Sequence, residues 1–242
     1  SISFGGPISV TWDLSRKLGQ KGIKVFVSTT NSNGKEKLKN VNTSKHENIE
    51  KNIFVRYYNE QIINIFSLSF IFNFFSDIKK SDIVYLQYLF HYTVIISLFY
   101  TWILKKKVIL CPRGCLGSWG MTYNNTYLLK KIWIFFFIKP FIKNIIWQAS
   151  SSLEKDDILS FFSHANVEII HDGIDFDKFT SGNIISKRDL VYKYTNCNFN
   201  AVSDVVFTMG RLHKIKRFDI IIDAFCLYVR ENKKSKLLIA GA

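Results

Sequence analysis

The chain has 242 residues and a mass of 28.2 kDa, with 33 lysines and arginines against 19 acidic residues, which gives a formal net charge of +14. Apolar residues make up 48% and charged residues 21%, so the chain can bury a core and a disordered chain is excluded. Its length suits one large domain or a domain and a half.

The charge leaves two interpretations open. The chain is rich in Lys, Ile, Asn and Phe, a composition that AT-rich coding produces without selection on charge. A basic surface can instead bind phosphates, nucleic acid or an acidic membrane leaflet.

Strand-like and helix-like apolar runs alternate along the first 170 residues. The expected strands are short and β-branched and lie at Ile23–Val27, Ile53–Tyr57, Ser81–Leu86, Lys107–Cys111, Ile145–Ala149 and Val167–Ile170. The expected helices lie at Ser9–Leu18, Ile62–Phe75, Thr93–Leu104, Tyr127–Lys139, Phe141–Ile146 and Leu153–Phe161. This alternation predicts an α/β fold with a parallel sheet covered on both faces, whose ligands bind at the carboxyl ends of the strands.

The character of the chain changes after residue 171. Residues 172–200 are polar, and a new unit then opens with a strand, a helix and a strand at Asp204–Met209, Phe218–Arg230 and Leu237–Ala240. We predict a complete doubly wound Rossmann-like domain, an interdomain connector and the first β-α-β of a second Rossmann-like domain, at residues 1–171, 172–200 and 201–242. Because the chain opens on Ser1 and its last strand runs into Gly241, we expect a fragment.

The cysteines and the apolar runs argue against a zinc site and a membrane span. The four cysteines, Cys111, Cys115, Cys197 and Cys226, show no Cys-x-x-Cys spacing, so we expect buried thiols and no zinc site. No apolar run reaches the roughly 20 residues of a spanning helix without interruption, so no membrane span is expected.

The most specific segment is Gly210-Arg211-Leu212-His213-Lys214-Ile215-Lys216-Arg217-Phe218-Asp219, which follows a strand and precedes a helix. That position offers backbone N–H groups to an anion. Arg211 and Lys216 add two cations that can hold both phosphates of a diphosphate. The alternative is a solvated basic loop, and the strand-loop-helix context favours the phosphate site.

Other motifs are weak alone and gain weight from their order. They are Gly5-Gly6 before a helix, Ala149-Ser150-Ser151-Ser152-Leu153-Glu154, and Asp172-Gly173-Ile174-Asp175. With the Gly210–Asp219 segment, they make the chain resemble the family 4 retaining glycosyltransferases (glycosyl transferases group 1) of the GT-B fold. The resemblance is greatest to bacterial enzymes that build lipopolysaccharide, capsule or exopolysaccharide. Cys111-Pro112-Arg113-Gly114-Cys115-Leu116 with Trp119 is similar to a Pro-Arg-Gly loop found in a subset of them.

The resemblance implies roles for individual residues. Arg211 and Lys216 match the pair that binds the donor's diphosphate and stabilises the leaving nucleotide, so no metal or other cofactor is expected. Gly5 and Gly6 match a glycine-rich loop whose backbone amides face the donor phosphate. Arg113 lies where many relatives carry a histidine that contacts the transferred sugar.

Two further residues keep alternatives. His91 is, with Arg113, a candidate catalytic residue, although a lone histidine among aromatics also suits a structural role. Glu154 matches the acidic residue of the family's Thr-Ser-x-x-Glu segment, and its role stays open beside that of a charge favoured by the helix dipole.

The sequence also departs from the family pattern. Asp172 stands where Asn is usual, Arg217 stands where Gly usually follows the lysine, and Tyr85–Phe90 replaces a His-x-His-Gly-Leu-Trp segment. The family's Glu-x7-Glu motif, which holds the donor sugar and ribose, lies beyond Ala242, so the fragment alone is expected to be inactive.

The expected function is that of a GT-B hexosyltransferase that moves a sugar from a UDP- or GDP-sugar to a lipid-linked saccharide. Its expected location is cytoplasmic, including a peripheral position at the inner face of the bacterial inner membrane. The run Lys130–Lys139 is either a buried helix or a segment that docks on anionic lipid.

Two alternatives stay open, a GT-B sugar-nucleotide epimerase and a non-catalytic basic module that binds membrane or nucleic acid. No nucleic-acid partner is expected, because no such motif is present and the basic residues are spread along the chain.

Overall fold

The structure is a computed structural model that describes residues 6–34, 36–62, 66–173, 186, 189, 192–194 and 204–241. The chain separates into two compact units, Ser1–Ile174 (unit 1) and Asp175–Ala242 (unit 2), and each is described by itself. Most of the predicted connector, like Gly5, lies outside the described residues.

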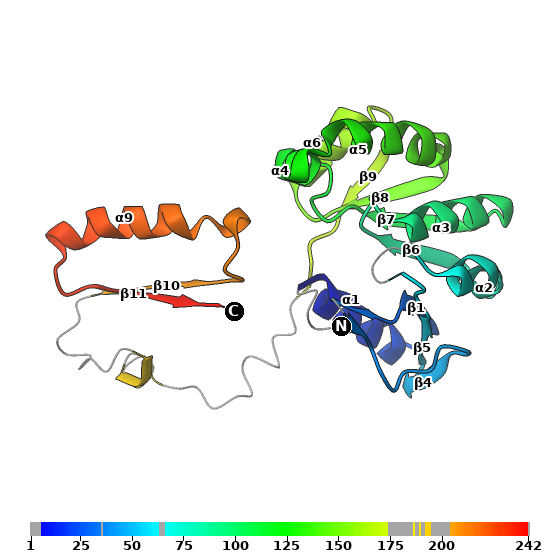
Figure 1. The fold of residues 1–242 in the computed structure, drawn as a ribbon, viewed down its shortest axis with the longest axis horizontal. Coiled ribbons are helices and arrows are strands. Elements are labelled where there is room, and N and C mark those ends of the chain that lie inside the picture. The colour runs from blue at the N-terminus through cyan, green and yellow to red at the C-terminus, as the bar shows by residue number, and fades with distance from the viewer. Residues whose placement is uncertain are drawn as a thin grey trace. The chain divides into compact units, whose positions relative to one another are not determined.

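Unit 1 contains two main sheets (Figure 1). In the first, of order β1-β5-β4, β1 (Val25–Thr30) runs parallel to β5 (Ile53–Tyr58), and β4 (Glu47–Glu50) runs antiparallel to β5. The second has the order β6-β7-β8-β9 and is parallel throughout, with strands at Ile83–Gln87, Lys107–Cys111, Ile145–Ala149 and Asn166–Ile169. A short antiparallel pair joins β2 (Ser32–Asn33) and β3 (Glu36–Lys37). The predicted parallel α/β arrangement is confirmed, in two sheets of this unit where one continuous sheet was expected.

Helices connect the strands of unit 1. They are α1 (Gly6–Gln20), α2 (Leu68–Lys79), α3 (Tyr92–Ile103), α4 (Ser118–Thr122), α5 (Tyr127–Trp133) and α6 (Ser152–Phe161). The π-helical turn η3 (Ile134–Ile138) extends α5, and the 3-10 segments are η2 (Tyr123–Asn125) and η4 (Lys139–Asn144).

Several element boundaries differ from the predictions. The expected helix at Ile62–Phe75 begins only at Leu68, because the Ser67 hydroxyl accepts a hydrogen bond from the Phe70 N–H and forms the N-cap. The expected helix at Phe141–Ile146 is wrong, since η4 is a short 3-10 segment that contains Pro140 near its start. β4 was missed because three of its four residues are polar and all four are exposed, which hides the apolar pattern of a strand.

The core of unit 1 lies around the β6–β9 sheet. Trp147, Leu110, Leu98, Ile138 and Ile158 are almost fully buried in one cluster. Burying each such side chain stabilises the fold by roughly 1.5–3 kcal/mol. The core therefore fixes the frame from which the loops at the carboxyl edge of the sheet extend.

Residues 204–241 of unit 2 form a β-α-β element (Figure 1). Its strands β10 (Val205–Met209) and β11 (Lys236–Ala240) are parallel, and α9 (Phe218–Glu231) runs alongside them. The short 3-10 turn η6 (Lys214–Lys216) lies between β10 and α9. The predicted strand, helix and strand are confirmed here. In the described ranges of both units, no helix combines the length and the apolar character needed to cross a bilayer.

Candidate functional site

Side chains from three loops meet at the carboxyl edge of the β6–β9 sheet. The loop after β7 carries Arg113, the loop after β8 leads into α6 with Glu154, and the segment after β9 carries His171 and Asp172. Parallel strands place their carboxyl ends at one edge, which is where such sheets bind ligands. We name these four residues, together with Ser150, the carboxyl-edge cluster.

Glu154 connects two of these loops. Its carboxylate accepts hydrogen bonds from the Gly114 N–H at 2.6 Å and from the Ser150 N–H and hydroxyl at 2.7 and 2.6 Å. The backbone N–H of Glu154 is in turn bonded to the hydroxyl of Ser151, the N-cap of α6. Glu154 is buried, so these contacts make it a support for the loop that carries Arg113.

Arg113 and Asp172 form an ion pair within the cluster. One guanidinium nitrogen, Nη1, lies 2.5 and 2.6 Å from the two carboxylate oxygens. Arg113 has φ = 56° and Gly114 has φ = 73°, so both residues of this turn are left-handed. His171 adds a third link, since its Nδ1 lies 2.7 Å from the Ser150 carbonyl oxygen.

Two buried polar atoms near Arg113 keep unused hydrogen-bonding capacity. Arg113 Nε has no hydrogen-bond partner among the residues that the structure describes, and Tyr85 Oη, which lies beside the Cys111 thiol, has none of standard geometry there. Burial raises the pKa of Tyr85 to about 12, so its hydroxyl stays protonated and able to donate. Burial also raises the pKa of the Cys111 thiol, which argues against a reactive thiolate at this edge.

The structure brings together some of the predicted residues and sets His91 apart. Arg113 and Glu154 meet in the cluster, while His91 is the N-cap of α3, where its Nδ1 accepts a hydrogen bond from the Thr93 N–H and lies 2.8 Å from the Thr93 hydroxyl. That contact supports the structural alternative for His91. Asp172 was noted only as part of the Asp-Gly-Ile-Asp motif, and neither Asp172 nor His171 was predicted as a site residue, because their partners are distant in sequence and only the strand order brings them together.

The diphosphate candidates lie on unit 2. Arg211 precedes η6 and Lys216 is its last residue; both are exposed, and neither side chain forms an ion pair within the described ranges. The aliphatic part of Lys216 lies along Gly210, where a Cβ in place of the glycine hydrogen would meet the lysine carbons at 3.5–3.6 Å. Gly210 also lies against Gly241, so close that any side chain at 241 would collide with the Gly210 carbonyl. The loop is therefore held close to the strand ends with both cations free to bind an anion.

The glycine-rich loop is described only from Gly6, the first residue of α1. Gly5 lies outside the described residues, so its predicted contact with a donor phosphate stays a prediction. Among the residues described, no group of three His, Cys, Asp or Glu side chains is arranged to hold a metal ion.

Comparison with known proteins identifies related folds but no matching family. No family model and no curated protein matches the chain. The crystal structure of Anabaena Alr3699/HepE in complex with UDP and glucose matches 79% of this chain, with a TM-score of 0.55 and 12% identity. The crystal structure of the same protein with UDP-glucose matches 76%, with a TM-score of 0.51 and 13% identity. The matched regions are 49% and 46% of those chains, so this chain spans about half their length. The similarity establishes a shared α/β fold.

Proposed function

We propose that the chain is part of a GT-B hexosyltransferase that moves a sugar from a nucleotide-diphosphate donor to a saccharide. Two features support the proposal: a parallel sheet with polar residues at its carboxyl edge, and a β-α-β unit with free cations after its first strand. The fold is shared with Anabaena HepE, which was crystallised with UDP and glucose and with UDP-glucose.

The observation that carries the proposal is the loop between β10 and α9. Arg211 and Lys216 are exposed there and form no ion pair in the described part of unit 2. In a transfer reaction, negative charge develops on the departing nucleotide diphosphate. Two fixed cations would stabilise that charge without a metal ion. By the resemblance, Arg113 of the carboxyl-edge cluster would contact the transferred sugar. Glu154 would position the loop that carries Arg113.

The finer features of the proposal come from the sequence resemblance. They are retention of configuration at the transferred carbon, a UDP- or GDP-sugar donor, and a lipid-linked acceptor used in making lipopolysaccharide, capsule or exopolysaccharide. Such an acceptor would place the protein at the cytoplasmic face of the inner membrane, as a peripheral protein.

The test uses the product of the complete reading frame that encodes this chain. It is incubated with labelled UDP- and GDP-sugars and a lipid-linked saccharide fraction, and the products are separated and their anomeric configuration is read by NMR. Label in the acceptor with retained configuration supports the proposal. Conversion of the donor without an acceptor would assign the epimerase alternative, and absence of both reactions would leave a binding module.

A further inference from the structure

An exposed apolar face lies on α5 and η3. Leu128, Phe135 and Phe136 are 69%, 59% and 62% exposed, although side chains of this size are usually buried. The opposite face holds the segment in place, since Ile134 and Ile138 are buried in the core of unit 1. The segment is thus neither a fully buried helix nor a loosely attached one.

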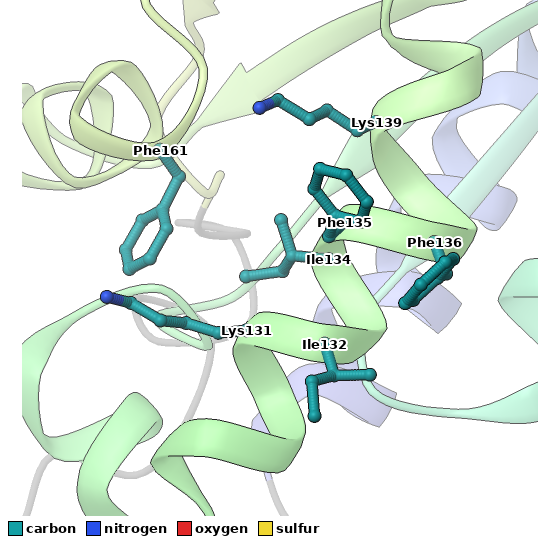
Figure 2. Close-up of a pocket in the computed structure, with 7 residues that line it drawn as sticks. All are labelled: Lys131, Ile132, Ile134, Phe135, Phe136, Lys139 and Phe161. Atoms are coloured by element: carbon teal, nitrogen blue, oxygen red, sulfur yellow. The ribbon is translucent and has the colours of Figure 1, made fainter.

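Two lysines border a hollow on this face (Figure 2). The hollow measures about 340 Å³, and its lining includes Lys131, Phe135, Lys139 and Phe161 of α6. The Lys131 ammonium lies 4.8 Å from the ring centre of Tyr127, and that of Lys139 lies 5.5 Å from the ring of Phe135. Each cation is therefore held beside an aromatic ring, the arrangement that suits the boundary between lipid headgroups and acyl chains.

The stretch of sequence that carries this face has charge of one sign. No Asp or Glu occurs between Asp82 and Glu154. The same stretch contains the basic residues Lys105, Lys106, Lys107, Arg113, Lys130, Lys131, Lys139 and Lys143. At the end of α3, the exposed Trp102 packs against Phe141 of η4 with ring centres 6.4 Å apart.

We propose that the α5–η3 face, defined by Leu128, Lys131, Phe135, Phe136 and Lys139, docks on an anionic lipid bilayer. The lysines attract the acidic headgroups, and the apolar side chains enter the interface below them. A nucleic-acid duplex would use the lysines through its phosphates and leave the phenylalanines exposed to water, so the observations favour lipid. The docking itself does not depend on the proposed function. Only its purpose, which is to bring the protein to a lipid-linked acceptor, rests on that function.

The test is flotation of the purified chain with vesicles of phosphatidylcholine alone and of phosphatidylcholine mixed equally with phosphatidylglycerol. We expect binding to the mixed vesicles only. Lys131→Gln with Lys139→Gln should weaken binding about 25-fold, from roughly fivefold for each lysine near the surface. Phe135→Ser with Phe136→Ser should weaken it about tenfold or more, because the apolar insertion is lost.

The matched controls alter equivalent residues elsewhere. Phe72→Ser changes a phenylalanine of α2 that is 75% exposed, and Lys233→Gln with Lys234→Gln removes two exposed charges from unit 2. Both should bind vesicles like the unaltered chain. No binding to mixed vesicles, or equal losses in controls and test variants, would overturn the inference. The inference would also be overturned if light scattering showed that the unaltered chain is a dimer and that the Phe135→Ser, Phe136→Ser variant is a monomer, since the face would then bind a second copy of the chain. The vesicle test needs no sugar donor, so its failure is distinct from failure of the transferase proposal.

Discussion

The carboxylate of Glu154 accepts a hydrogen bond of 2.6 Å from the backbone N–H of Gly114, a residue 40 positions earlier in the chain. Gly114 follows Arg113 in a turn whose two residues are both left-handed. A buried carboxylate that binds a backbone N–H of such a turn limits the orientations open to the neighbouring side chain. Glu154 of α6 thus holds the turn in place, and Arg113 extends from that turn into the candidate site.

Glu154→Gln should destabilise unit 1 by about 1–3 kcal/mol, because the amide group would bring its own N–H donors against the Ser150 and Gly114 donors. The measurement is urea unfolding followed by tryptophan fluorescence, which reports unit 1 because all 5 tryptophans precede residue 174. Glu168→Gln, on the exposed side of β9, is the control and should be near neutral. Equal midpoints for both variants would contradict the supporting role of Glu154.

The ion pair between Arg113 and Asp172 should couple the loops after β7 and β9. Because the Asp172 side chain is 39% exposed, we expect a coupling free energy of only about 0.5–1 kcal/mol. It is measured by a double-mutant cycle of Arg113→Ala and Asp172→Ala in the same unfolding experiment. Additive effects of the two substitutions would show that the pair contributes nothing to stability.

The sequence predicted the elements of this site better than their connections. Arg113 and Glu154 stand in local motifs, and the strands before them have the continuous apolar character of a parallel sheet, so both could be found by pattern. The contacts from Glu154 to Gly114 and from Arg113 to Asp172 could not, because they depend on β7, β8 and β9 being neighbours in that order. The apolar run around Phe135 left two interpretations open, since composition does not reveal which face of a helix meets the core.

His46 should make unit 1 less stable in mild acid. Burial lowers the pKa of His46 from 6.5, with Asp77 opposing this shift and the Arg56 and Lys80 charges adding to it. The unfolded chain therefore binds a proton below about pH 6.5 that the folded chain rejects. The stability contributed by neutral His46 is complete above pH 6.5 and is lost as the pH falls towards the lowered pKa. Urea midpoints measured from pH 7.5 to 5 test this.

His46→Gln should flatten that pH dependence, because it removes the titrating group from beside Asp77. His164→Gln, at an exposed position before β9, is the control and should keep the decline. An unchanged slope in His46→Gln would assign the acid sensitivity to other groups.

Arg217 has the backbone conformation of a glycine. Its φ and ψ of 49° and 43° are left-handed at the start of α9. In the family that the sequence resembles, this position is usually Gly. Its guanidinium pairs with Asp219 at 3.0 Å, but both groups are exposed and the pair adds little. Arg217→Gly should therefore slow amide hydrogen exchange in α9 relative to Arg217→Ala, which loses the same pair and keeps the Cβ. Faster exchange in the glycine variant would show that the left-handed conformation is not strained there.

Arg211 and Lys216 should recognise the diphosphate of a nucleotide and not its base. Charge-assisted hydrogen bonds of this kind contribute about 1.5–3 kcal/mol, so Arg211→Ala and Lys216→Ala should each weaken UDP binding roughly 10- to 100-fold. Calorimetry with UDP and with uridine separates recognition of the diphosphate from recognition of the base. Uridine lacks the phosphates, so its affinity should change little in either variant. Lys214→Ala alters an exposed lysine of the same η6 turn and is the matched control, with UDP affinity close to that of the unaltered protein. Chelation of divalent cations should leave UDP binding unchanged, since the two side chains supply the positive charge. If UDP and uridine lost affinity equally in Arg211→Ala, the loop would be a structural element of unit 2 and the diphosphate site would lie elsewhere.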